Sequence, residues 1–173
     1  MSDPANEYRI TAAVAADAPL VAALIRDSFK VQAQQLNLTE VEYPNYVAFE
    51  TERAARQRIQ KSRVDLLWHG RTPLGTIGYA ADSIQGNIER LAVLPAHRGQ
   101  ALGKLLLTHA ELELFVTGQC QMISLSIVAS FGRLRHYYES LGYRSLETRR
   151  YPSLPFAVLH MQKTIDTWRG GQA

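Results

Sequence analysis

The stretch 91–104 reads Leu-Ala-Val-Leu-Pro-Ala-His-Arg-Gly-Gln-Ala-Leu-Gly-Lys. Along it, the spacing of apolar residues changes from that of a strand to that of a helix. Pro95 ends the strand because proline cannot donate a ladder hydrogen bond. A helix is predicted to begin near Gln100 or Ala101. This strand–turn–helix order decides the fold. Residues 87–128 then form a β-α-β unit, whose two strands run parallel with a right-handed crossover.

The turn inside this stretch has the features of an anion site. The first N–H groups of the following helix have no partner within the helix, and they carry the positive end of its dipole. Gly99, Ala101 and Gly103 are small enough for a phosphate to approach the backbone, and Arg98 and Lys104 add positive charge. The segment fits a pyrophosphate cradle, and it fits a tight turn without a ligand equally well. Neither GxxxxGK[ST] nor GxGxxG occurs in the chain, so P-loop and Rossmann sites are not supported.

Outward from this unit, alternating and helical patterns predict the remaining elements. Strands are expected over 8–14, 64–68, 74–81, 87–94, 122–128, 143–150 and 156–162. Helices are expected after Asp17, over about 48–63, from about 100 to Gly118, and over 131–141. This order predicts an α/β (α+β) fold with a mixed central sheet of six to seven strands flanked by about four helices. We expect one domain over 8–163, with tails at 1–7 and 164–173 and fraying from Trp168 onward.

Composition narrows the class of protein further. The 173 residues are 46% hydrophobic and 20% charged, which is ordinary globular usage. One cysteine, Cys120, excludes an internal disulfide framework and a multi-cysteine zinc site, and we expect it to be buried. Residues 1–86 hold 9 basic and 10 acidic side chains and residues 87–173 hold 10 and 6, which hints at an anionic ligand in the second half. No signal peptide, membrane span or nucleic-acid stripe is expected, and a cytoplasmic location is the default.

Two motifs together resemble the GCN5-related N-acetyltransferase (GNAT) superfamily. The family's acetyl-CoA motif, [Q/R]-x-x-G-x-[G/A], resembles Arg98-Gly99-Gln100-Ala101-Leu102-Gly103, in which Ala101 stands at the glycine position. The stretch 136–143, His-Tyr-Tyr-Glu-Ser-Leu-Gly-Tyr, is similar to the family's Tyr-Glu-x-x-Gly-Phe. The likeness covers about 8–163 with the expected order of elements.

The resemblance implies transfer of an acetyl group from acetyl-CoA, without a metal, to an amine of a small molecule or a protein N-terminus. The amine would attack directly in a ternary complex. In the family, pantetheine lies between the fourth and fifth strands, so Leu91 and Val93 would contact it through main-chain groups. The pyrophosphate would be held by Arg98, Gly99, Gln100, Ala101, Leu102, Gly103 and Lys104.

The chain departs from the family at two positions. Ala101 replaces a glycine, and Phe131 replaces an asparagine seven residues before Tyr138. These departures keep a second hypothesis open, that of a non-catalytic acyl-CoA-binding module.

Two residues are candidates for proton transfer. Tyr138 matches the family's catalytic tyrosine and is a candidate acid for the leaving thiolate. Glu89 is a candidate base, because it shares a face with Leu91 and Val93 if no bulge intervenes.

The acceptor is expected to contact the loop 31–50. Its carboxylates Glu40, Glu42 and Glu50 favour a cationic amine, and they are equally consistent with a solvated surface. Sheet edges in this fold often pair, so the sequence leaves a homodimer open.

Overall fold

The computed structural model describes residues 7–168, and the elements there follow the predicted order. Within these residues the helices are α1 (Ala18–Gln35), α2 (Glu52–Lys61), α3 (Leu102–Leu112) and α4 (Gly132–Ser140). The strands are β1 (Tyr8–Ala12), β2 (Arg63–His69), β3 (Thr72–Asp82), β4 (Gln85–Val93), β5 (Met122–Val128), β6 (Arg144–Arg150) and β7 (Ala157–Thr164). One mixed sheet has the order β1-β2-β3-β4-β5-β7-β6, which confirms the predicted fold class.

The described chain divides into two compact units. Unit 1 holds the described residues up to Tyr79 together with Arg90–His109, and unit 2 holds Ala80–Glu89 and the described residues from Ala110 onward. The prediction of one domain over 8–163 stays a prediction. Of the tail that was expected to fray, residues 169–173 lie outside the described part.

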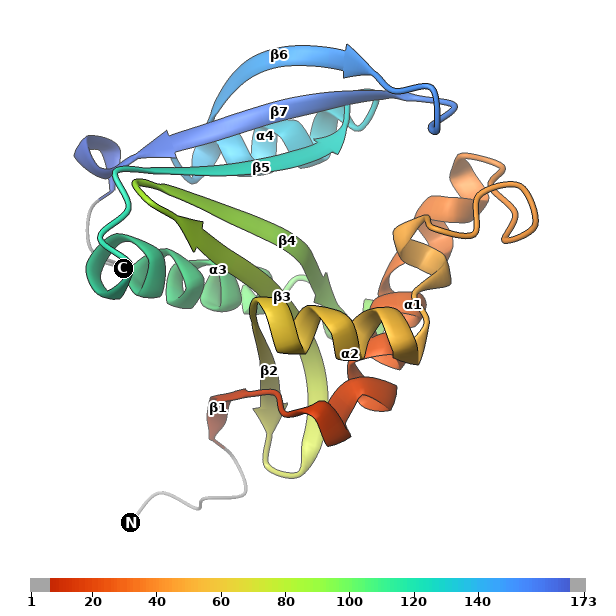
Figure 1. Ribbon diagram of the computed structural model, residues 1–173, viewed down its shortest axis with the longest axis horizontal. Helices are drawn as coiled ribbons and strands as arrows, with labels where there is room; N and C mark the ends of the chain where they lie inside the picture. Colours follow the sequence, from red (N-terminus) through yellow and green to blue (C-terminus); the bar gives the residue numbers. More distant parts are fainter. Residues whose placement is uncertain (1–6, 169–173) are drawn as a thin grey trace. The chain divides into compact units, whose positions relative to one another are not determined.

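Unit 1 is built on the antiparallel strands β1, β2 and β3. Ile10 pairs with Leu67 across β1 and β2, and Leu66 pairs with Thr76 across β2 and β3. Helices α1 and α2 pack against each other, and α2 also contacts β2 (Figure 1). The buried core here is contributed by α1, α2, β2 and β4, and it consists of Ala18, Val21, Ala22, Leu24, Ile25, Ala55, Val64, Leu66 and Ala92.

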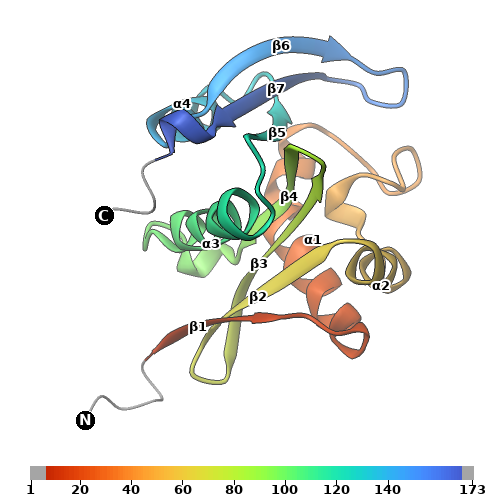
Figure 2. The ribbon, with the colours of Figure 1, turned by 60° about the vertical axis from the view of Figure 1, so that its left-hand side comes forward.

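Unit 2 contains the antiparallel strands β5, β7 and β6, with α4 against β6 (Figure 2). Strand β4 runs parallel to β5, as the β-α-β unit predicts, and its register covers Gln85–Asn87 against Met122–Ser124. Gly142 follows α4 with φ 92, the left-handed conformation that suits glycine at a helix end.

Two predicted boundaries were wrong: the loop expected over 31–50 begins later, and so does the helix expected from about 48. Helix α1 continues to Gln35, because Ala33 is buried and the glutamines around it are good helix formers that carry no apolar period. Helix α2 begins only at Glu52, where the Thr51 hydroxyl accepts a hydrogen bond from the Ala54 N–H at 3.1 Å.

Gly118 lies in the C-cap position at the end of the third helix, where the sequence predicted the helix to end. Its φ is −80, so it does not need a left-handed conformation, whereas Gln119 has φ 52. A Cβ at Gly118 would lie 2.9 Å from the Leu114 carbonyl oxygen. A π-helix (Glu113–Thr117) follows α3, and a side chain at position 118 would collide with its backbone, so glycine fits this close approach.

Candidate active site

The turn between β4 and α3 has the backbone that an anion cradle requires. It begins with the 3-10 turn η4 (Pro95–His97) and continues into Gly99, which has φ 78. A Cβ built on Gly99 would meet no atom within 4 Å, so the space beside its backbone is open. Gly99, Gln100 and Ala101 are exposed. The turn therefore presents bare main chain to solvent, with room for a phosphate group.

The start of α3 supplies the donors of this cradle. The N–H of Leu105 donates to the Ala101 carbonyl at 3.0 Å, so the amides of Leu102, Gly103 and Lys104 lie ahead of this helical hydrogen bond. The Leu102 side chain is 4% exposed, which anchors the helix to the core and leaves only its main chain for a ligand. Lys104 is exposed and adds a positive charge to the same turn.

Arg98 positions the turn as well as adding charge. Its Nη2 donates to the Ser28 carbonyl on α1 at 2.5 Å, and its Nε donates to the Val93 carbonyl on β4 at 3.3 Å. A guanidinium has five N–H donors, so further donors remain for an anion. Arg98 thus ties the cradle to α1 and β4. Gln100 is held more weakly, by the Tyr8 hydroxyl at 3.5 Å from its Oε1.

Strand β4 is not regular near the predicted site. Arg90 has φ 49, a left-handed conformation within the strand. The prediction that Glu89 shares a face with Leu91 and Val93 assumed a continuous extended strand, and Arg90 breaks that alternation. The role of Glu89 as a base therefore stays a prediction, and the alternation of side chains along β4 no longer supports it. Leu91 and Val93 are half-buried.

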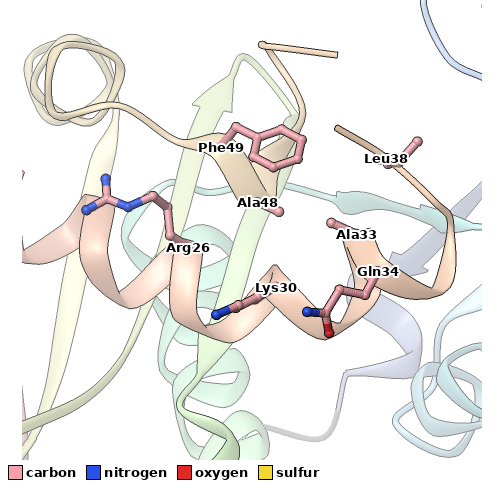
Figure 3. Close-up of a pocket in the computed structure, with 7 residues that line it drawn as sticks. All are labelled: Arg26, Lys30, Ala33, Gln34, Leu38, Ala48 and Phe49. Atoms are coloured by element: carbon pink, nitrogen blue, oxygen red, sulfur yellow. The ribbon is translucent and has the colours of Figure 1, made fainter. Parts of the chain in front are cut away.

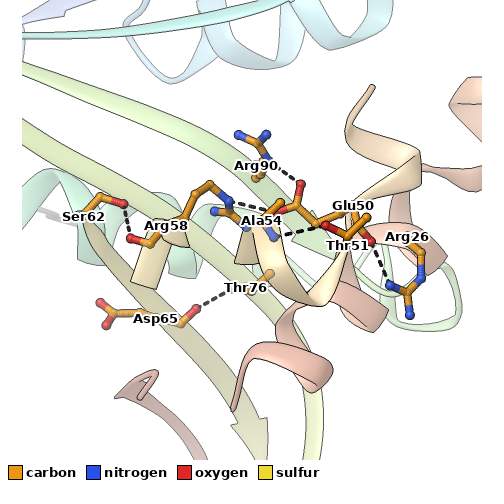
Figure 4. Close-up of polar contacts among 9 residues, drawn as sticks. All are labelled: Arg26, Glu50, Thr51, Ala54, Arg58, Ser62, Asp65, Thr76 and Arg90. Carbon is orange, nitrogen blue, oxygen red and sulfur yellow. Dashed lines mark hydrogen bonds and ion pairs between the residues drawn. The ribbon is translucent and has the colours of Figure 1, made fainter. Parts of the chain in front are cut away.

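Glu50 is the centre of a buried ion cluster in unit 1 (Figure 4). Its carboxylate is 5% exposed and contacts Arg58 (Nε to Oε1, 2.9 Å) and Arg90 (Nε to Oε2, 3.1 Å). Its carbonyl accepts a hydrogen bond from Arg26 Nη1 at 2.8 Å. Glu50 was predicted to attract a cationic acceptor. The structure uses it instead to compensate two arginines and to hold the left-handed residue of β4 in place.

Of the loop carboxylates, Glu40 and Glu42 are exposed, and Glu42 accepts a hydrogen bond from the Thr39 hydroxyl at 2.7 Å. The predicted preference for a cationic amine now depends on these two side chains alone.

A second buried carboxylate, Asp65 on β2, was missed by the sequence analysis. It is 0% exposed and accepts hydrogen bonds from Tyr79 (2.7 Å), His109 (2.9 Å) and Arg63 (2.7 Å). Burial acts to raise the pKa of Asp65, but the hydrogen bonds from His109, Arg63 and Tyr79 outweigh it and hold the pKa below its ordinary value. The cluster joins β2, β3 and α3.

Tyr138 lies on α4 in unit 2 and is 7% exposed. Its ring packs edge to face on Tyr143 with centroids 5.7 Å apart, and also contacts Tyr137 at 5.3 Å. Burial, with a smaller effect of Tyr137, raises the pKa of Tyr138 well above its usual range. Among residues 7–168 no hydrogen bond of its hydroxyl is formed. The hydroxyl therefore keeps its proton and is not committed to another residue.

The neighbour of Tyr138 is fixed by a buried ion pair. The Tyr143 hydroxyl donates to Glu111 Oε1 at 2.9 Å, and Lys163 Nζ lies 2.9 Å from Glu111 Oε2. Glu111 and Lys163 are 4% and 7% exposed. The pair holds α3, β7 and the start of β6 around the Tyr143 ring, against which Tyr138 packs.

Cys120 is buried and free, as predicted, and burial raises the pKa of its thiol. Over the described range, no group of three or more His, Cys, Asp or Glu side chains is arranged to hold a metal ion. Nor does any helix there combine the length and apolar character needed to cross a membrane.

Comparison with known proteins agrees with these features. The family model described as acetyltransferase (GNAT) domain matches residues 62–145, which include β2–β4, the cradle, α3 and Tyr138. Among curated proteins no match is found.

Solved structures with the same fold span nearly the whole chain. PaiA N-acetyltransferase from Thermoplasma acidophilum, solved with coenzyme A, has a TM-score of 0.76 at 15% identity and covers 91% of this chain and 99% of its own. The ribosomal-protein-S18-alanine N-acetyltransferase from Escherichia coli has a TM-score of 0.66 at 20% identity, covering 92% and 94%. A GNAT-family acetyltransferase from Streptococcus pneumoniae has a TM-score of 0.68 at 20% identity, covering 92% and 99%. The GNAT family model thus matches the middle part of the chain, and these N-acetyltransferase structures share its fold.

Proposed function

We propose that this protein transfers an acetyl group from acetyl-CoA to an amine by direct attack in a ternary complex. The observation that carries the proposal is the cradle, where Gly99 leaves open space beside its backbone and α3 begins three residues later, at Leu102. Its donors suit a diphosphate. A relative with this fold was solved with coenzyme A, which supports the same ligand here.

The residues of the chain divide the task between binding and proton transfer. The amides at the start of α3, with Arg98 and Lys104, would bind the diphosphate, and main-chain groups of Leu91 and Val93 would orient the pantetheine arm. The coenzyme supplies the acetyl group as an activated thioester. Tyr138, protonated over the ordinary pH range, would give its proton to the leaving sulfur.

The amine itself must be neutral to attack, because an ammonium ion has no lone pair. Glu89 is the proposed base, acting through water. Glu89 is half-buried in β4 next to Arg90. No step calls for a metal ion.

Two observations favour the second hypothesis of a non-catalytic acyl-CoA-binding module. Ala101 has φ 58, a left-handed conformation that glycine adopts with less strain than alanine. Phe131 is the residue before α4, in the N-cap position, and its side chain cannot accept a hydrogen bond from the helix. Both are departures from the family pattern at the proposed cofactor site.

A thiol-release screen with acetyl-CoA separates the two hypotheses. Small amines, amino acids and peptides with a free N-terminus are each incubated with the protein, and the acetamide product is identified by mass spectrometry. An acetyltransferase releases one thiol for each acetamide formed. If the protein binds coenzyme A but acetylates no amine of the panel, the binding module is the correct assignment.

A further inference from the structure

A pocket of about 310 Å³ lies in unit 1 between α1 and the 3-10 turn η3 (Val47–Phe49) (Figure 3). Figure 3 shows Ala48 pointing toward α1, with Phe49 beside it. Ala33 and Leu38 complete the apolar lining. This volume is at the lower end of the range for small-molecule sites, so it suits a ligand of amino-acid size.

The polar lining of the pocket is cationic. Lys30 is exposed, and among residues 7–168 its ammonium forms no hydrogen bond or ion pair. Arg26 uses one N–H for the Glu50 carbonyl at 2.8 Å, and the guanidinium has four more. Gln34 adds an amide, and no acidic residue lines the pocket. Such a lining suits a ligand that carries both an anionic group and an apolar group. It has no acidic side chain with which to bind a cationic group.

The pocket wall is connected to the strand that is proposed to bind pantetheine. Phe49 is followed directly by Glu50, whose Oε2 lies 3.1 Å from Arg90 Nε in β4. Arg90 in turn precedes Leu91. The pocket and this part of β4 therefore share one buried polar framework within unit 1 (Figure 4).

We propose that this pocket receives the carboxylate and the apolar side chain of an amino-acid-like acceptor. This inference rests on the proposed acetyltransferase function. Lys30 and Arg26 contact the carboxylate, and Phe49 and Ala48 contact the apolar side chain. An amino acid carries its amine one carbon from the carboxylate, so holding the carboxylate restricts where the amine lies.

Binding can be measured apart from catalysis with a product-like probe. N-acetyl-L-leucine is titrated calorimetrically into protein saturated with coenzyme A, and N-acetyl-L-leucinamide, which lacks the carboxylate, serves as the paired probe. We expect the carboxylate probe to bind more tightly. The variant Lys30→Met should weaken its binding about three- to tenfold and leave the amide probe unaffected. Lys61→Met, an exposed lysine on α2 outside the pocket, is the matched control and should change neither.

The outcomes for the pocket and for the proposed function are distinguishable. Equal affinity for the two probes, no binding of either, or no effect of Lys30→Met overturns the pocket proposal. This holds even if the protein acetylates amines in the thiol-release screen. Lys30-dependent binding of N-acetyl-L-leucine supports the pocket proposal. If the protein shows this binding but acetylates no amine, the pocket proposal is kept and the proposed transferase function is rejected.

Discussion

At the scale of single residues, Ala101 is the clearest departure from what the backbone prefers. Its φ of 58 costs an alanine about 1 kcal/mol more than a glycine. We expect Ala101→Gly to raise the free energy of unfolding by about 0.5–1 kcal/mol, as measured by urea unfolding.

The control for this prediction is Ala96→Gly in η4, five residues earlier. Ala96 lies in a 3-10 turn, which alanine adopts readily, so glycine there only makes the unfolded chain more flexible. Ala96→Gly should lower the free energy of unfolding by a similar amount. The same sign of change for both variants would show that Ala101 is not strained.

Tyr138 should act through its hydroxyl. Tyr138→Phe keeps the ring that packs on Tyr143 and removes the proposed proton donor, so we expect the turnover rate to fall about a hundredfold while coenzyme A affinity is kept. Tyr137→Phe, at a side chain 36% exposed, is the control and should have little effect. A rate for Tyr138→Phe equal to that of the native protein would exclude it as the acid.

The pH dependence of the same step follows from the direction of the pKa shift. The donor is the protonated form, and burial raises the pKa of Tyr138 above its ordinary 10.0. The Tyr138-dependent rate should therefore not decline between about pH 7 and about pH 9. Rates of the native protein and Tyr138→Phe, compared across this range, test the expectation.

At the scale of elements, Asp65 joins β2 to β3 and α3 and should make stability pH-dependent. Its pKa is lower in the folded protein than the ordinary 3.8, so the folded state binds fewer protons than the unfolded chain near that pH. The stabilisation is complete above pH 3.8 and is lost as pH falls through the lower, folded-state pKa.

The test at this scale is Asp65→Asn, followed by urea unfolding at several pH values. We expect a loss of about 2–3 kcal/mol at neutral pH, because an amide accepts only part of the hydrogen bonds from His109, Arg63 and Tyr79. The loss should shrink in acid. A loss that stays constant down to the lowest accessible pH would contradict the assignment.

The sequence predicted the elements well and the polar clusters poorly, for a physical reason. Hydrophobic period and turn residues are local signals, and they correctly located β5 at Met122–Val128 and α4 (Gly132–Ser140) within 131–141. Contacts between distant residues leave no such pattern. Glu50 and Arg90 are 40 residues apart, and Asp65 and His109 are 44 apart. Arg90 adopts a left-handed conformation, so Glu89 no longer has to share a strand face with Leu91 and Val93. An alternating pattern of apolar and polar residues cannot reveal such a conformation.

At the scale of the whole molecule, the two motifs indicated a resemblance to the GNAT superfamily because they carry backbone requirements as well as side chains. The glycine at position 99 has positive φ and open space beside it, as a phosphate cradle needs. The acceptor was harder to predict. The acidic loop suggested a cation, whereas folding buries Glu50 and leaves Lys30 and Arg26 lining the pocket.

Titration of isotope-labelled protein with coenzyme A, followed through backbone amide signals, tests the central claim most directly. The largest changes should fall on Gly99–Lys104, and Gly99→Val should abolish them, because a side chain there fills the open space and opposes the positive φ. Gly132→Ala, where an added Cβ also meets open space, should leave them intact. Unchanged signals over Gly99–Lys104 at millimolar coenzyme A, in protein that is still folded, would contradict the account.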